Sequence, residues 1–197
     1  MARVLILLAE GFEEIEAVTV VDLLRRAGIE VCSAALAPDA RFDSGLVFGS
    51  HGIAVRADAL LADVDDAGFD MVVLPGGMPG AENLKQDARV LALLERASSR
   101  GSYVAAICAA PSVLAHAGLL DGRAATSFPG FLDAQSTPGL QLSTAPVVID
   151  GRIVTSRGPG TAIDFSLTLI ELLVGRSVRE QIEPRLQRPP LATPQPA

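Results

Sequence analysis

Tyr103–Pro111 reads YVAAICAAP and is the most informative stretch of the chain. Its first five residues are apolar or aromatic, which predicts a strand covered on both faces. Cys108 follows at once, and after two alanines comes a proline that suits the first turn of a helix. A buried strand that runs through a nucleophilic residue into a helix is the layout of a nucleophile elbow. We therefore expect an α/β protein with Cys108 at the tip of a sharp turn.

The same alternation of short apolar and longer amphipathic segments continues on both sides of this stretch. Apolar runs predict buried strands at residues 3–9, 30–36, 70–74 and 103–107. Helical periodicity predicts helices at residues 13–27, 87–100, 111–117 and 162–173. Asp150-Gly151 predicts a hairpin between strands at 145–149 and 152–156. Strands that alternate with helices imply a mostly parallel sheet with helices on both faces, a three-layer α/β sandwich.

The length of 197 residues favours one domain, which we expect to span residues 1–188. Residues 189–197 read PPLATPQPA, with too little apolar surface to pack, and are expected to form a disordered Pro-rich tail. Residues 37–52 are rich in Gly, Asp and Ser and are expected to form a loop with some edge structure, followed by a short strand at 53–56.

Composition excludes several classes of function. The net charge of −7, with one Tyr and no Trp, argues against a nucleic-acid or anionic membrane surface as partner. No run of 18 apolar residues predicts a membrane span, and the acids after the first strand argue against a signal peptide. Two cysteines form neither a disulfide framework nor a zinc cluster. We therefore expect a cytoplasmic protein without a metal or other cofactor.

The two cysteines differ in their expected reactivity. A thiol at the start of a helix is stabilised as a thiolate by unpaired N–H groups and the positive end of the helix dipole, so Cys108 is the candidate nucleophile. The alternative is a buried structural thiol, since free cysteine is often buried. Cys32 lies inside a predicted strand, where that structural role is the favoured interpretation.

Ligand sites in parallel sheets lie beyond the carboxyl ends of the strands. Residues 9–16, 75–79 and 108–111 all follow such ends and should converge there. In the first of these segments Glu13, Glu14 and Glu16 open a helix. Acids there are common dipole complements, but one of them could relay a proton to the thiol. Glu13 and Glu16 share a face, and the spacing does not choose between them.

The second segment, Pro75-Gly76-Gly77, offers backbone without side chains. Its N–H groups could form an oxyanion pocket with that of Ala109, although a plain tight turn is the alternative. The two histidines contribute little. His116 lies eight residues after Cys108, about 12 Å along a helix, so a Cys–His pair between them is excluded. His51 lies in the loop region.

Four motifs in order resemble the DJ-1/PfpI superfamily, most closely its ThiJ/YajL-like branch. They are AEGFEEIE at 9–16, LPGG at 74–77 followed by GAENL at 80–84, AICAAP at 106–111, and TSRGPGTAIDF at 155–165. The resemblance covers residues 3–188. It implies a flavodoxin-like sandwich, a homodimer, and a reactive cysteine at Cys108.

The resemblance also assigns roles that spacing left open. Glu16 matches the protonated glutamic acid that hydrogen-bonds the cysteine sulfur, and Gly76, Gly77 and Ala109 match the backbone oxyanion pocket. His51 falls where many relatives place an arginine contributed near the site by the partner subunit. Ala109 stands where protease-like members have histidine, which argues against peptidase activity. Phe128 stands where several close relatives have a second histidine.

These features imply a cofactor-free glyoxalase or deglycase that acts on 2-oxoaldehydes, such as methylglyoxal and glyoxal, or on their protein adducts. Cys108 would be the nucleophile and Glu16 the general acid/base, with Cys108 a thiolate and Glu16 protonated at neutral pH. The alternative is an oxidative-stress sensor or redox-regulated chaperone that acts through a Cys108 sulfinate. Isonitrile hydration on the same scaffold is a third interpretation, to which no residue points.

Overall fold

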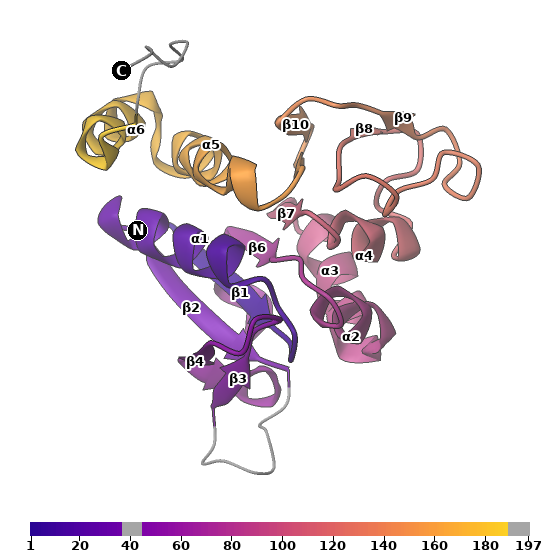
Figure 1. The fold of residues 1–197 in the computed structure, drawn as a ribbon, viewed down its shortest axis with the longest axis horizontal. Coiled ribbons are helices and arrows are strands. Elements are labelled where there is room, and N and C mark those ends of the chain that lie inside the picture. The colour runs from indigo at the N-terminus through magenta and orange to yellow at the C-terminus, as the bar shows by residue number, and fades with distance from the viewer. Residues whose placement is uncertain (37–44, 189–197) are drawn as a thin grey trace, which may run out of the picture.

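A computed structural model describes residues 1–36 and 45–188 of the chain (Figure 1). Within them a seven-stranded sheet has the order β10-β11-β7-β6-β1-β2-β5. Its strands are β1 Arg3–Leu8, β2 Glu30–Ala35, β5 Ala59–Leu60, β6 Met71–Leu74, β7 Tyr103–Ile107, β10 Val147–Asp150 and β11 Ile153–Ser156. Two small pairs lie outside this sheet: β3 Leu46–Phe48 with β4 Ala54–Arg56, and β8 Ala124–Ala125 with β9 Gln141–Leu142.

Helices connect the strands. The α-helices are α1 Glu14–Arg26, α2 Gly80–Gln86, α3 Ala88–Ser99, α4 Pro111–His116, α5 Ala162–Val174 and α6 Arg176–Ile182. Short 3₁₀ turns lie at η1 Leu61–Asp63, η2 Asp66–Gly68, η3 Pro159–Thr161 and η4 Glu183–Leu186. No helix within the described residues is long and apolar enough to cross a membrane.

The five principal parallel strands have the flavodoxin order. Numbered along the chain, β1, β2, β6, β7 and β11 lie side by side as 2-1-3-4-5. Within the seven-stranded sheet of the described residues, only β10 runs antiparallel, paired with β11 across the predicted Asp150-Gly151 turn. The expected flavodoxin-like sandwich, with its mostly parallel sheet, is therefore confirmed.

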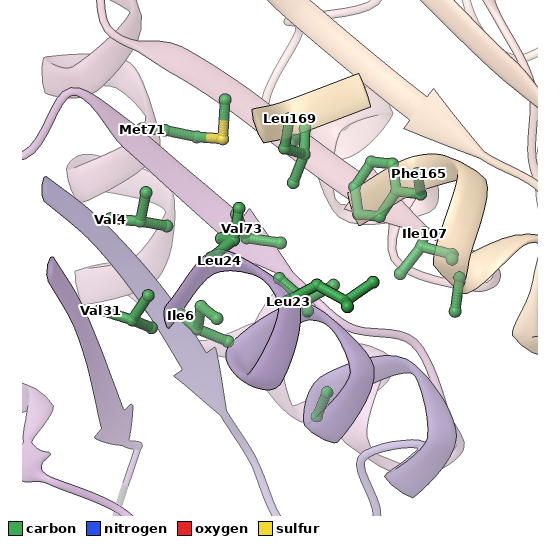
Figure 2. Close-up of a cluster of buried hydrophobic side chains, with 14 of the residues drawn as sticks. Val4, Ile6, Leu23, Leu24, Val31, Met71, Val73, Ile107, Phe165 and Leu169 are labelled. Carbon is green, nitrogen blue, oxygen red and sulfur yellow. The ribbon is translucent and has the colours of Figure 1, made fainter. Parts of the chain in front are cut away.

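The sheet is covered on both faces because its strands are apolar on both faces. In β1, Val4 and Ile6 belong to the core cluster under α1, α5 and α6, whereas Leu5 and Leu7 belong to the cluster under α3 and α4. Figure 2 shows the first cluster, in which Leu23 and Leu24 of α1 and Phe165 and Leu169 of α5 gather over β1 and β6. A continuous apolar run is what a strand needs when neither face meets water.

The structure adds elements that periodicity did not predict. Helices α2 and α6 are only seven residues long, and β8 and β9 only two, so none shows a clear period. Of the predicted loop at 37–52, the part from 46 to 48 forms β3, and residues 37–44 lie outside the described residues. The predicted tail at 189–197 also lies outside them.

Candidate active site

Cys108 occupies a sharp turn at the carboxyl end of β7. Its φ is +65°, a left-handed value that costs energy for any residue but glycine. Hydrogen bonds hold the turn on both sides: the Cys108 N–H donates to the Ser156 carbonyl at 2.9 Å, and its carbonyl accepts from the Phe128 N–H at 2.9 Å. The side chain is half-buried. This is the geometry expected of a nucleophile elbow.

The donors that face the sulfur come from backbone turns. The N–H groups of Ala109 and Gly77 hydrogen-bond the thiol and act to lower its pKa. Helix α4 begins at Pro111, three residues later, and is only six residues long. Of the two expected sources of thiolate stabilisation, unpaired N–H groups and a helix dipole, the two local N–H groups are therefore the more important.

Glu16 in the first turn of α1 is the carboxyl that reaches this thiol. Its side chain is fully buried, with 0% exposed. Oε2 accepts a 2.8 Å hydrogen bond from the Gly76 N–H, and Oε1 is buried without a hydrogen-bond donor among the described residues. Burial raises the pKa of Glu16 to about 7. Hydrogen bonds from Gly76 and Cys108 act to lower this pKa, but burial has the larger effect. The neutral form of the acid is thereby favoured.

The ionisation of the two groups is coupled. Burial, followed by the charge and hydrogen bond of the Glu16 carboxylate, raises the pKa of Cys108 to about 12. The expected Cys108 thiolate is paired with a protonated Glu16, and the same condition applies here, because no thiolate forms at neutral pH while Glu16 is ionised. With Glu16 protonated, that charge is absent and only burial opposes the two N–H donors. The pair therefore carries one negative charge, not two.

Gly76 and Gly77 give the pair room. A Cβ on Gly76 would lie 2.7 Å from Cβ of Cys108 and 2.9 Å from Oε2 of Glu16. Gly77 has a φ of +90°, and a Cβ there would overlap the backbone of the first turn before α1. Because the Gly76 N–H is engaged by Glu16, the N–H groups that remain beside the sulfur are those of Gly77 and Ala109.

Glu13, Glu14 and His51 form a separate cluster within this same chain. His51 Nδ1 lies 2.9 Å from Glu14 Oε2 and 3.5 Å from Glu13 Oε2. Burial opposes ionisation of Glu14, but hydrogen bonds from His51 and from the N–H of Ile53 prevail and lower its pKa to about 2. The pKa of His51 is raised, first by its hydrogen bond with Glu14. One carboxylate oxygen each of Glu13 and Glu14 and one ring nitrogen of His51 lie within 4.8 Å of one another, close enough to bind the same cation.

Gly158 is a neighbour of the sulfur that the sequence reasoning did not single out. A Cβ at this position would lie 3.9 Å from Sγ of Cys108 and 3.3 Å from Cδ2 of Phe128. Gly158 follows β11, which is parallel to β7 and directly beside it. Sites in parallel sheets form beyond the carboxyl ends of strands, so the segment after β11 was a candidate as well. The turn signal that the sequence offers for this strand, the hairpin at Asp150-Gly151, precedes β11 and lies at its other end.

Cys32 lies on β2, away from these donors. It is also half-buried, and its pKa is raised by burial and then by the charge of Asp58. Its Cα pairs with that of Leu5 in the middle of the parallel ladder. The structure thus surrounds the two cysteines very differently.

Known proteins match this chain over nearly its whole length. The model of the DJ-1/PfpI family matches residues 2–172. Protein DJ-1 homolog A of Arabidopsis thaliana is 43% identical over 180 residues, 91% of this chain but 45% of that protein, so the chain spans less than half of this relative. A deglycase of Pyrococcus abyssi is 36% identical over 171 residues, 87% of this chain and 99% of that protein. The structure of oxidized Toxoplasma gondii DJ-1 superposes with a TM-score of 0.85 at 38% identity, covering 95% of this chain and 98% of that one.

Proposed function

Because the chain belongs to the DJ-1/PfpI family, we propose that it is a cysteine-dependent, cofactor-free enzyme that converts 2-oxoaldehydes such as methylglyoxal and glyoxal to 2-hydroxy acids. One observation carries this proposal: a half-buried thiol at a strained elbow adjoins a fully buried carboxyl whose pKa is near neutrality. A general acid/base works best when its pKa lies near the operating pH.

The reaction begins with addition. The sulfur of Cys108 bonds to the aldehyde carbon, the π electrons of the carbonyl move to its oxygen, and that oxygen takes the proton of Glu16. The product is a hemithioacetal, and Glu16 is left as a carboxylate. The N–H groups of Gly77 and Ala109, which lie beside the sulfur, would stabilise the oxygen while its negative charge develops.

Proton transfer then moves electrons within the substrate. The Glu16 carboxylate removes the hydrogen on the first carbon as a proton and delivers it to the neighbouring ketone oxygen, which gives an enediol and restores the carboxylate. Glu16 then takes the proton of the first oxygen and delivers it to the second carbon, which gives a thioester. Water breaks the C–S bond and releases the 2-hydroxy acid and the thiol. The first carbon is oxidised and the second reduced, so the reaction needs no external oxidant or hydride carrier.

The same chemistry extends to aldehyde adducts on proteins. A deglycase name is carried by the Pyrococcus abyssi relative, and glycated proteins are the corresponding substrates we propose here. Adducts and free aldehyde exchange, so a purified free 2-oxoaldehyde is the cleaner substrate for a first test.

Turnover of methylglyoxal to lactate in the absence of glutathione tests this proposal. Wild type should form lactate stoichiometrically, and Cys108→Ala should not. Retention of the wild-type rate by Cys108→Ala would show that the sulfur is not the nucleophile. Chiral analysis of the lactate adds a check, because a protein-bound enediol is expected to be reprotonated on one face.

A second candidate function is oxidative sensing through the same sulfur. The N–H donors of Ala109 and Gly77 that face the thiol would also bind the oxygens of a sulfinate. Two equivalents of peroxide would each deliver one oxygen atom to Cys108 and leave as water. Mass spectrometry after mild peroxide should find the sulfinate on Cys108 with Cys32 unmodified, and equal oxidation of both cysteines would contradict this role.

A homodimer is the assembly we propose. Ile15 and Val18 of α1 and Ile53 beside β4 are 57%, 49% and 59% exposed, and the Ile53 N–H donates to Glu14 of the same helix. Three large apolar side chains that gather on one surface suit contact with a second copy. Sedimentation should show a dimer in wild type, and Val18→Asp should shift the protein toward monomer.

A further inference from the structure

A pocket of about 350 Å³ opens beside the candidate nucleophile. Its lining combines four rings with one arginine, one threonine and two glycines: Phe128, Pro129, Pro146, Pro159, Arg157, Thr161, Gly158 and Gly160. Small-molecule sites typically enclose about 300–1,000 Å³ and are lined mainly by apolar side chains with few polar groups. The pocket is far larger than a three-carbon aldehyde requires.

Gly158 connects this pocket to the sulfur. It belongs to the pocket wall, yet a Cβ on it would lie 3.9 Å from Sγ of Cys108 and 3.3 Å from the Phe128 ring. The ring and the sulfur therefore both border the space that a side chain at position 158 would fill. A molecule whose reacting carbon meets Sγ would project its substituent past Gly158 toward Phe128.

Both walls of this passage are held in place. The Phe128 N–H donates to the Cys108 carbonyl at 2.9 Å, and this bond fixes the backbone of Phe128 next to the elbow. The Thr161 hydroxyl accepts from the Gly158 N–H at 3.1 Å and lies 2.7 Å from the Ser156 hydroxyl. A preformed pocket binds its ligand without a large ordering cost.

The Phe128 ring is partly open to solvent on the wall of this pocket. It is 45% exposed although the ring already has a partner, Phe131, whose centroid lies 6.1 Å away at 75° in an edge-to-face arrangement. A phenyl ring on the wall of a pocket offers a further face for stacking with an aromatic substituent. Where several relatives place an imidazole, this chain therefore presents an apolar contact surface.

We propose that this site selects 2-oxoaldehydes whose ketone carbon carries a large apolar, preferably aromatic, substituent, and that Phe128 determines this specificity. The inference rests on the proposed 2-oxoaldehyde reaction and adds its substrate class. Burial of one extra methylene in such a pocket changes kcat/KM by roughly 10- to 200-fold, so replacing methyl by phenyl should produce at least about a tenfold preference.

A series of 2-oxoaldehydes with methyl, tert-butyl and phenyl substituents tests the inference in initial-rate assays. In wild type, kcat/KM should rise along the series, mainly through a lower KM. Phe128→Ala should reduce the phenyl-to-methyl ratio of kcat/KM at least about fivefold, and Phe128→His should reduce it in the same direction. Leu142→Ala, which removes a 53% exposed apolar side chain elsewhere, is the matched control and should leave the ratio unchanged.

The outcomes separate the two proposals. Turnover of methylglyoxal that depends on Cys108, with a flat series or an unchanged ratio in Phe128→Ala, would overturn the specificity and leave the proposed reaction standing. Absence of turnover with every member of the series would overturn the proposed reaction and the specificity with it. Circular dichroism of Phe128→Ala confirms that the variant is folded, and Phe128→Leu supplies a second variant that keeps an apolar side chain.

Discussion

The two cysteines of this protein have similar exposure and opposite surroundings. Both are half-buried, and burial raises the pKa of each. Cys32 lies within β2 among the charges of Asp58 and Glu30, which further raise its pKa. Cys108 lies beyond the end of β7, where two backbone N–H groups and a buried carboxyl meet its sulfur. We propose that the donors and the proton partner, rather than exposure, make Cys108 the more reactive of the two thiols.

The largest expected difference is in turnover. Cys108→Ser should lower kcat/KM for methylglyoxal at least about 10³-fold, because loss of a nucleophile removes the covalent route. Cys32→Ser should leave kcat/KM within about twofold, since Cys32 lies in the middle of β2, away from the elbow and its backbone donors. Steady-state lactate formation measures both. A similar loss of kcat/KM in Cys108→Ser and Cys32→Ser would show that the different surroundings of the two cysteines do not affect turnover.

The elbow should also be far more sensitive to a single methyl group than other turns. Gly76→Ala places a Cβ 2.7 Å from Cβ of Cys108 and 2.9 Å from the Ile107 carbonyl, so the elbow must shift. We expect at least about a 10²-fold loss of kcat/KM, since an ångström of misplacement can cost that much.

The matched control for that variant is Gly101→Ala. Gly101 has a φ of +77° and open space around it, so an alanine there costs about 1 kcal/mol of stability without crowding the elbow. Turnover by Gly101→Ala should match wild type, while its denaturation midpoint falls. If Gly76→Ala behaves in the same way, the close packing around Cys108 has no role in catalysis.

The proton on Glu16 should appear in the pH dependence of stability. Folding raises its pKa from 4.5 to about 7, so between these values the folded state binds more protons than the unfolded state. Stability from this group is therefore greatest below pH 4.5 and falls by about 3 kcal/mol in total as pH rises to about 7, where the Glu16–Cys108 pair loses its first proton.

Glu16→Gln should abolish that part of the slope. Urea denaturation of wild type and Glu16→Gln from pH 4.5 to 8 measures the difference, with Cys32→Ser as a control whose slope should match wild type. Parallel slopes in wild type and Glu16→Gln would show that the carboxyl does not change its ionisation on folding.

Much of this arrangement could be predicted from the sequence because it is local. The apolar run of β7, the proline at the start of α4 and the single cysteine between them define the elbow within nine residues. Strand alternation likewise predicted the sheet, and Asp150-Gly151 its antiparallel edge. Short elements such as α2 escaped because seven residues hold too few turns to show a period.

The parts that escaped prediction depend on contacts between distant segments. The spacing left Glu13 and Glu16 equivalent, and the family resemblance selected Glu16. The physical difference lies in their packing: Glu16 meets Gly76, whereas Glu13 lies beside Ser50 and His51. The position of Gly158 next to Cys108 requires the pairing of β11 with β7.

The central claim is that Cys108 ionises because Glu16 keeps its proton and the local N–H groups face the sulfur. Thiolate absorbance against pH in a Cys32→Ser background measures this most directly, with Cys108→Ser as the blank. Wild type should titrate below the usual thiol pKa of about 8.5. Glu16→Leu, which removes a charge-assisted hydrogen bond worth roughly 1.5–3 kcal/mol, should raise that pKa by about one to two units. A wild-type titration above 8.5 that falls in Glu16→Leu would contradict the claim, because it would place the negative charge on Glu16.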